Sequence, residues 1–572
     1  MIADFFKRER LRTIFCLAIS LSTSFLMITN YYFGYFFSIP ASADFIFLID
    51  HISDVTGTIS NNFNLNLVLL LLPEFIMLIS FFCNSLKRTI DNIDSFFLLK
   101  IRKRVIIGCT IVLCAYFLNG FYRFQQVHCP AGMDPFFKLM VLGPYPYYAE
   151  ELARFARSSI WGAKADQATI DDILRQLSSD ESKQNRATNI PWLKKAERPN
   201  IVFIQIESLK SEVLDLVIEG KPVTPNLSLL AQKSLFFTDF YAQGRTTSDC
   251  DFIALNSLLV PQNGLIVSRP GNTFLSIAGI LRDYGYKTIA LNGARRKIWN
   301  HEKMYKAYGF NEFYALEDFP DEESFGLGLS DPAIFKQAGK LMEKTDKPFF
   351  LFFTTLSSHH PFYMPDSKKL IRANTSDPLA NSYLESINYA DSSLGGFIEF
   401  LHSSEIMKNT VVFIYGDHTI RMDYFYDRIN TRQKPNLHTM HFLDSRTPLL
   451  IYSPYLIRPA QIPVTSGQID LAPTVLDLCD ISQPKVFLGH SLFADSHPDA
   501  VVNFQGIAKA GQHILYDYEA RTQTFASSKT LNTWESAETP QIADKLAKQL
   551  ELSRLLVDFN LIGSIIGLTH AN

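Results

Sequence analysis

The chain has 572 residues, which suggests more than one domain. Its formal net charge is −3, so the composition gives no basis for a nucleic-acid partner. Hydrophobic residues make up 47% of the chain, and most of the long apolar runs lie before residue 123. These properties favour a membrane-associated segment followed by a larger globular part.

Three apolar runs near the N-terminus are long enough to cross a bilayer, which takes about 20 apolar residues. They cover residues 13–37, 65–83 and 105–122. A single such run could be a buried core helix or a signal peptide. The first run is longer than a signal-peptide core and has no small-residue cleavage site before Pro40. Three runs in series therefore predict a transmembrane domain over residues 1–123.

The lysines and arginines between these runs predict the orientation of the chain. Four basic residues precede the first run, none occurs in residues 38–64, and six occur in residues 84–104. Because positive charge collects on the cytoplasmic side, we expect the N-terminus and the 84–104 loop to be cytoplasmic. With three spans, all residues after 123 then lie outside the cytoplasmic membrane.

Residues 124–197 are predicted to form a connector. Its segment 133–156 mixes aromatic and apolar residues with a few charges, which is typical of a helix lying in the membrane interface. The alternative is a helix packed on the globular domain. The polar end of the connector stops at Pro199, and we place the start of an extracytoplasmic domain, 198–572, at this point.

The pattern from residue 200 onward predicts an α/β fold. Short apolar runs rich in β-branched and aromatic residues read as buried strands over 201–206, 287–292, 348–356, 410–416 and 447–453. Helical patterns lie between them, for example over 382–404 and 469–481, and the tail 540–572 looks like a terminal helix with an apolar end. We expect a mainly parallel sheet flanked by helices on both faces.

Side chains that can bind a metal follow three of the predicted strands. Glu207 follows the first strand, His359 follows the third, and Asp417 and His418 follow the fourth. Any one of these alone is more often a cap or a solvated group. Ligands bind beyond the carboxyl ends of parallel strands, so we expect the groups to converge there. Carboxylate and imidazole ligands together suit a divalent ion such as manganese or zinc.

The stretch "GRTTSDCDF" (244–252) precedes an apolar helical run. A hydroxyl at a helix start can be activated by a metal, and the helix N-terminus favours an anionic phosphate. The alternative is a simple helix cap by Ser248 or Asp249. Both interpretations can hold together if one residue caps the helix while the threonine before it reacts.

Taken together, these motifs resemble the alkaline phosphatase superfamily, and within it the lipoteichoic acid synthase branch of phosphoglycerol transferases. The resemblance rests on "IVFIQIESL", "GRTTSDCDF", "NGARRKIWNHEKMY", "TTLSSHHPF", "NYADSSLGGFIEFL", "IYGDH" and "IDLAPTVLDL", and it covers about residues 200–493 and the multi-span N-terminus. It implies the alkaline phosphatase/sulfatase-like fold.

The resemblance also implies residue roles. One divalent metal, manganese first and otherwise zinc or magnesium, would be bound by Glu207, Thr247, Asp417 and His418. Thr247 would be the nucleophile, and Thr246 is its rival by one position. The substrate would be contacted by His359 at the phosphate, Trp299 at the headgroup, and Arg245 and His301.

Two motifs depart from the family pattern. The family's His-Gly-Asp is here Asn292-Gly293-Ala294, and its Trp-Asn-Arg is here Trp299-Asn300-His301. These positions contact the glycerol phosphate in that family, so the resemblance implies the reaction more strongly than the glycerol headgroup. Arg245, Arg295 and Arg296 are nearby cations that could compensate.

The sequence therefore predicts a membrane-anchored, metal-dependent transferase in the bacterial cytoplasmic membrane, with its catalytic domain outside. It would move a phospholipid headgroup, phosphoglycerol first, through a phospho-threonine to a glycan or glycolipid. The donor would be phosphatidylglycerol or phosphatidylethanolamine. A phosphoethanolamine transferase is the main alternative.

A hydrolase and a catalytically silent binding protein fit the sequence less well. The hydrolase would be a sulfatase or a phosphodiesterase-type enzyme. A sulfatase makes formylglycine from the Cys or Ser of a Cys/Ser-x-Pro-x-Arg motif, but here Cys250 is followed by "DFIA". A silent binding protein is disfavoured by the complete set of Glu, Thr, Asp and His.

Overall fold

The computed structural model describes residues 197–261, 265–419, 445–495, 497–504, 506–510, 513–517, 525–528, 535–537 and 541–570, with helix α10 (Gln167–Ser179) and a few isolated positions before it. The three predicted spans and most of the connector lie outside the described residues. Within the described part, no helix is both long and apolar enough to cross a membrane. The chain divides into two compact units, residues 1–161 and 162–572, and the described sheets lie in the second.

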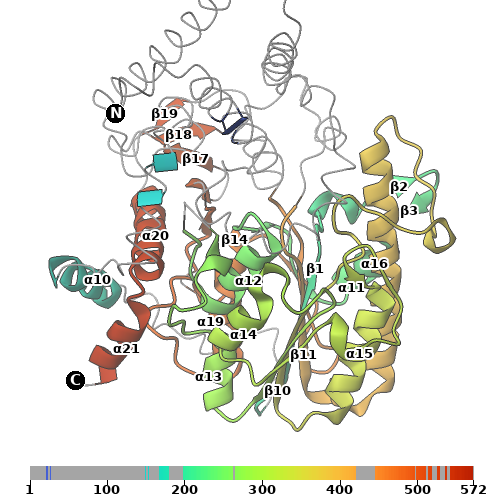
Figure 1. The fold of residues 1–572 in the computed structure, drawn as a ribbon, viewed down its shortest axis with the longest axis horizontal. Helices are drawn as coiled ribbons and strands as arrows, with labels where there is room; N and C mark the ends of the chain where they lie inside the picture. The colour runs from blue at the N-terminus through green and yellow to red at the C-terminus, as the bar shows by residue number, and fades with distance from the viewer. Residues whose placement is uncertain are drawn as a thin grey trace, which may run out of the picture. The chain divides into compact units, whose positions relative to one another are not determined.

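An eight-stranded sheet forms the centre of this unit (Figure 1). All its strands run the same way except β12, which is antiparallel to both of its neighbours. The five predicted strands are all in this sheet. In spatial order the strands are β13 (Ala460–Ile462), β4 (Leu235–Phe237), β12 (Leu449–Tyr452), β11 (Thr410–Gly416), β1 (Asn200–Ile206), β10 (Phe349–Thr354), β6 (Lys287–Asn292) and β7 (Glu312–Tyr314).

The central strands are buried on both faces, as their continuous apolar sequences predict. Every residue of β1, β10 and β11 is buried. On one face of the sheet, the ring of Phe203 meets the rings of Phe350 and Phe413 at centroid distances of 5.3 and 4.9 Å. A sheet buried this deeply gives the residues at its strand ends a fixed frame.

Helices cover both faces of the sheet (Figure 1). One layer contains α11 (Pro225–Ala231), α15 (Asp331–Lys344) and α16 (Pro378–Ser403), whose apolar residues share a core cluster with β1 and β10. The other layer contains α12 (Thr247–Asn256), α13 (Ile277–Asp283), α14 (His301–Ala307) and α19 (Leu471–Leu478). The predicted α/β class with flanking helices is confirmed for this unit.

The C-terminal part adds a second sheet that the sequence did not predict. It is antiparallel, in the order β15 (Ala500–Val502), β16 (Ile507–Ala510), β17 (His513–Asp517), β18 (Phe525–Ser528) and β19 (Glu535–Ala537). Helices α20 (Gln541–Asp558) and α21 (Ile562–His570) follow it. The Ser553 hydroxyl on α20 accepts a 2.6 Å hydrogen bond from the Leu259 amide just after α12. Helix α20 is therefore packed against the segment that follows α12.

Three two-stranded pairs complete the described elements. They are β2 (Val217–Ile218) with β3 (Lys221–Pro222), β5 (Phe240–Tyr241) with β14 (Ser466–Gly467), and β8 (Ser324–Phe325) with β9 (Gly328–Leu329).

Candidate metal centre and active site

The acidic residues of the site lie side by side because their strands are parallel neighbours. Ile206 at the end of β1 pairs with Gly416 at the end of β11, so the next residues, Glu207 and Asp417, leave the sheet together. A Cβ atom at Gly416 would lie 2.0 Å from Thr447 Oγ1 and 2.5 Å from the Leu209 carbonyl oxygen. Only glycine fits this close approach.

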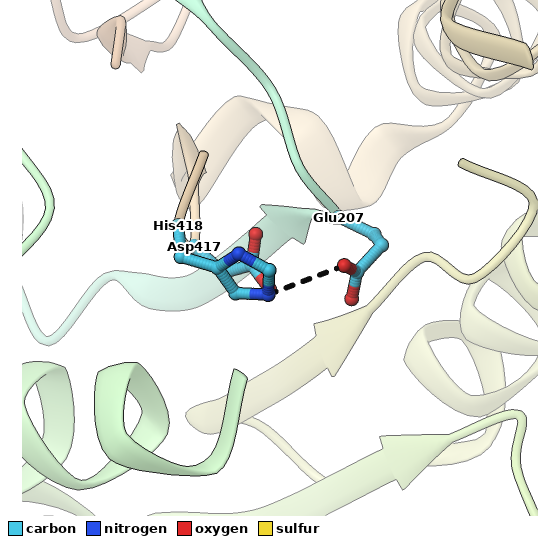
Figure 2. Close-up of side chains that lie close together, drawn as sticks. All are labelled: Glu207, Asp417 and His418. Atoms are coloured by element: carbon cyan, nitrogen blue, oxygen red, sulfur yellow. Dashed lines mark ion pairs between the residues drawn. The ribbon is translucent and has the colours of Figure 1, made fainter. Parts of the chain in front are cut away.

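Glu207, Asp417 and His418 form a compact cluster of candidate ligands (Figure 2). Their ligand atoms all lie within 4.8 Å of one another. His418 Nε2 is 3.3 Å from Glu207 Oε1 and 3.4 Å from Asp417 Oδ2. Both carboxylates are buried, while the imidazole is partly exposed. Three of the predicted metal ligands therefore come together.

The two candidate threonines point to different partners. Thr247 is the first residue of α12, and its Oγ1 lies 3.0 Å from Glu207 Oε2 and 3.4 Å from His418 Nε2. Thr246 is the N-cap, and its hydroxyl accepts a 3.2 Å hydrogen bond from the Asp249 amide. The structure thus brings Thr247 to the cluster and uses Thr246 to cap the helix.

The charges of the cluster perturb one another strongly. Burial raises the pKa of Glu207, but His359 and His418 outweigh it and hold that pKa well below its usual range. Burial, together with the negative charge of Glu207, raises the pKa of Asp417. Burial lowers the pKa of His418, but Asp417 and Glu207 outweigh it and raise the pKa to about 10. Nearby positive charge thus favours the ionised form of both buried carboxylates.

This arrangement fits a divalent cation. Asp417 Oδ2 is buried and accepts no hydrogen bond from the described residues, and such an atom usually has a partner. Two carboxylates and one imidazole are the ligand types that a catalytic divalent metal takes, with a further position left for a reacting group. The Thr247 hydroxyl lies beside Glu207 and His418 and would be available as that reacting group.

Comparison with known proteins relates the part of the chain that carries this site to a protein family. Residues 199–481 match the family model described as Sulfatase. The matched stretch contains all eight strands of the central sheet.

The predicted resemblance to lipoteichoic acid synthases is confirmed by relatives of this domain. Lipoteichoic acid synthase 2 of Bacillus subtilis is 26% identical over 454 residues, which cover 75% of this chain and 67% of the relative. The crystal structure of a lipoteichoic acid synthase from Listeria monocytogenes has a TM-score of 0.59 at 23% identity and covers 70% of this chain and 98% of that one. A protein in the alkaline phosphatase superfamily from Vibrio parahaemolyticus has a TM-score of 0.54 at 20% identity, covering 69% and 96%.

Ser208 is a residue of this site that the sequence analysis missed. Its hydroxyl donates a 2.8 Å hydrogen bond to Glu207 Oε1, and its amide donates one of 2.8 Å to Asp417 Oδ1. The backbone at Ser208 has a φ of 56°, and the Tyr383 hydroxyl donates to its carbonyl oxygen at 2.9 Å. One residue therefore orients both carboxylates. Its position directly after Glu207 was the available signal.

We expect Ser208→Ala to weaken binding of Mn²⁺ about tenfold, because partners that orient metal ligands typically contribute this much. The amide that bonds Asp417 remains in the variant, so the loss comes from Glu207 alone. Isothermal titration with Mn²⁺ measures it, and Ser403→Ala at the exposed end of helix α16 is the control. Unchanged affinity in Ser208→Ala would mean that Glu207 is oriented without this hydroxyl.

His359 stands after β10, the strand on the other side of β1 from β11. Its Nδ1 is 2.7 Å from the His360 carbonyl oxygen, which requires a proton on that nitrogen. That bond leaves Nε2 as the ring nitrogen that other groups can contact. The effect of His359 on the pKa of Glu207 indicates that the imidazole is close to the cluster.

Trp299 and His301 lie on the segment that follows β6. Trp299 has a φ of 50°, a left-handed conformation, and packs partly buried against the core. His301 is buried at the start of α14, and its Nε2 is 3.4 Å from the hydroxyl of Ser248, the residue after Thr247. The structure therefore places His301 beside the residue that follows the candidate nucleophile.

The basic residues near the predicted headgroup pocket have internal partners. Arg245 is buried, its Nε donates a 2.6 Å hydrogen bond to Asp249, and its guanidinium lies over the Phe504 ring. Arg296 pairs with Asp318. Arg295, in contrast, is exposed. Arg245, which was predicted to contact the substrate, is thus held by an ion pair with Asp249 in the first turn of α12.

Proposed function

We propose that this protein is a metal-dependent phosphotransferase that moves a phospholipid headgroup, phosphoglycerol first, to an extracytoplasmic glycan or glycolipid. The observation that carries the proposal is the Thr247 hydroxyl, 3.0 Å from Glu207 and 3.4 Å from His418 at the helix start. The similarity of the chain to relatives named lipoteichoic acid synthases supports a phosphotransferase rather than a binding protein.

The reaction has two steps, in which Thr247 is first bonded to phosphorus and then released. In the first, Thr247 Oγ1 bonds to the phosphorus, the bond to the diacylglycerol oxygen breaks, and that oxygen gains the proton that the threonine loses. In the second, an acceptor hydroxyl bonds to the same phosphorus, the threonine–phosphorus bond breaks, and Thr247 regains a proton. Such in-line displacement needs positioning and stabilisation of negative charge more than covalent chemistry.

The residues of the chain divide these tasks. Glu207, Asp417 and His418 would hold a divalent ion, manganese first, which lowers the pKa of the hydroxyl and offsets phosphoryl charge when bound. Thr246 keeps α12 capped, so that Thr247 stays at the helix N-terminus, where free amides favour a phosphate. We assign His359 to the substrate phosphate and Trp299 with His301 to the headgroup.

The membrane is part of this proposal. We infer that residues 1–123 anchor the protein through three spans, that 124–197 form a connector, and that 198–572 lie outside the cytoplasmic membrane. A bilayer anchor raises the effective concentration of a lipid donor around the site. The orientation rests on the basic residues that flank the apolar runs.

A phosphoethanolamine transferase is the second candidate, and Ala294 is the observation that favours it. Where the glycerol-binding pattern has an acid, Ala294 is buried and its backbone bridges to Gly328. This position therefore offers no carboxylate to accept hydrogen bonds from glycerol hydroxyls. A sulfatase-type reaction at Cys250 has no such support, because that thiol is buried and its pKa is raised by burial.

The experiment that tests the proposal supplies the purified full chain with Mn²⁺ and vesicles of either phosphatidylglycerol or phosphatidylethanolamine. We expect diacylglycerol release from phosphatidylglycerol, and none in the presence of a chelator. Release from phosphatidylethanolamine alone would establish the second candidate. No release from either lipid by folded protein that binds Mn²⁺ would refute headgroup transfer.

A further inference from the structure

Asp251 is a buried carboxylate on α12 to which the proposed reaction assigns no role. It is 2% exposed and lies one helical turn after Thr247. Its Oδ1 accepts a 2.6 Å hydrogen bond from the side-chain amide of Gln205, and its Oδ2 accepts one of 2.7 Å from the Tyr305 hydroxyl. One side chain thus joins α12 to strand β1 and to helix α14.

The contact with Gln205 runs alongside the contact between Thr247 and Glu207. Gln205 and Glu207 are two residues apart on the same side of the chain leaving β1, about 6.7 Å along a strand. Thr247 and Asp251 are four residues apart on one side of α12, about 6 Å along a helix. The two spacings match. The Gln205–Asp251 pair and the Glu207–Thr247 pair therefore form two parallel links between β1 and α12.

The contact between Asp251 and Tyr305 likewise runs alongside a contact of the predicted headgroup residue His301. On α14, His301 and Tyr305 are four residues apart and their rings stack at a centroid distance of 5.3 Å. His301 meets Ser248 at 3.4 Å, while Tyr305 meets Asp251 at 2.7 Å. Asp251 therefore anchors α12 to both elements that carry neighbouring site residues.

We propose that Asp251 is the positioning residue that sets the register of α12 along β1 and α14, and thereby holds Thr247 opposite Glu207. Because both carboxylate oxygens are used, a shift of α12 along its axis would break both contacts at once. The side-chain hydrogen bonds of Asp251 among the described residues go to Gln205 and Tyr305, and neither is a proposed metal ligand. The inference rests on the proposed function for the role of Thr247.

A buried acid that only stabilises the fold provides the matched control. Asp391 on α16 is also buried, at 1% exposure, and also joins two elements. Its carboxylate accepts hydrogen bonds of 3.0 and 2.7 Å from the amides of Asn226 and Leu227 at the start of α11. It lies in the helix layer on the other face of the sheet from α12. Loss of Asp391 should reduce stability without moving Thr247.

The test is a double-mutant cycle read by Mn²⁺ affinity and thermal unfolding of the full chain in detergent. We expect Asp251→Ala to weaken Mn²⁺ binding about tenfold, which is the effect expected of Thr247→Ala. In both variants the Thr247 hydroxyl would no longer be available to the metal. Combined with Thr247→Ala, Asp251→Ala should weaken binding no further. Asp251→Asn, which keeps the shape of the side chain, should restore affinity, and Asp391→Ala should lower only the unfolding temperature.

The opposite results have defined meanings. Mn²⁺ affinity unchanged in Asp251→Ala, or effects of the two substitutions that add in full, would overturn the positioning role. If Asp251→Ala does not fold, Gln205→Met and Tyr305→Phe can replace it in the same double-mutant cycle. Each of them removes one of the two hydrogen bonds to Asp251. A wild-type protein that binds Mn²⁺ but releases no diacylglycerol would refute the proposed transfer. The double-mutant cycle could still be interpreted, because it is measured by Mn²⁺ affinity.

Discussion

Thr247→Ala is expected to abolish headgroup transfer, by at least about 10³-fold, while the protein stays folded. The reason is chemical, because this hydroxyl is the atom that would bond to phosphorus in the proposed reaction. It lies at the N-terminus of α12, is only partly buried, and makes no contact that caps the helix. Diacylglycerol release from phosphatidylglycerol and thermal unfolding, measured on the same sample, check the prediction.

Thr246→Ala is the control one residue away, and we expect the opposite pattern. The Thr246 hydroxyl accepts from the Asp249 amide, so its loss should lower the free energy of unfolding by about 1 kcal/mol. Transfer should remain within a few-fold of wild type at a temperature where the variant is folded. Loss of transfer in Thr246→Ala with activity retained in Thr247→Ala would contradict the assignment and exchange the two roles.

Asp417→Asn is expected to remove metal-dependent activity with little change in shape. The amide has the size of the carboxylate, but it lacks the charge that holds a divalent cation beside Glu207 and His418. We expect at least a hundredfold weaker Mn²⁺ binding, measured by isothermal titration, because a charged carboxylate ligand contributes more than a neutral hydroxyl or an orienting partner, whose effect is about tenfold to a hundredfold. Transfer should fall with metal occupancy.

Thermal unfolding with and without metal gives the control for this variant. Asp417 Oδ2 is buried beside a second carboxylate and accepts no hydrogen bond from the described residues, so without added metal the neutral amide should not lower the unfolding temperature. Addition of Mn²⁺ should then raise the unfolding temperature of wild type but not of Asp417→Asn. An equal rise in both would show that Mn²⁺ binds elsewhere.

Much of the fold follows from local sequence patterns. The five apolar runs predicted as strands are all strands of the central sheet, because continuous β-branched and aromatic sequence fits a strand buried on both faces. The run at 447–453 was not predicted to be antiparallel, since strand direction depends on the connection rather than on the strand's composition. The second sheet was missed because its strands are short and lack a strong apolar pattern.

The site was predictable where it depends on strand ends. Glu207 and Asp417 meet because parallel strands end at one edge, which sequence order alone can indicate. The direction of each side chain could not be predicted, so Thr246 and Thr247 were separable only by comparison with a motif. The contact of Arg245 with the Phe504 ring and the bond from the Ser208 amide to Asp417 both join segments that are far apart in the sequence.

The headgroup is the part of the proposal that depends least on local geometry. Ala294 and His301 stand where the related pattern has an acid and an arginine, and the structure buries both residues. A carboxylate and an arginine would each bind glycerol hydroxyls, and neither is present at these positions. The donor must therefore be identified by chemistry at the nucleophile itself.

The most direct test of the mechanism is peptide mass spectrometry of the full chain after incubation with Mn²⁺ and phosphatidylglycerol. We expect an adduct with the mass of phosphoglycerol on Thr247, absent from the Thr247→Ala variant and removed when an acceptor is supplied. Folded, metal-loaded protein that releases diacylglycerol without any adduct on Thr247 would contradict the phospho-threonine mechanism.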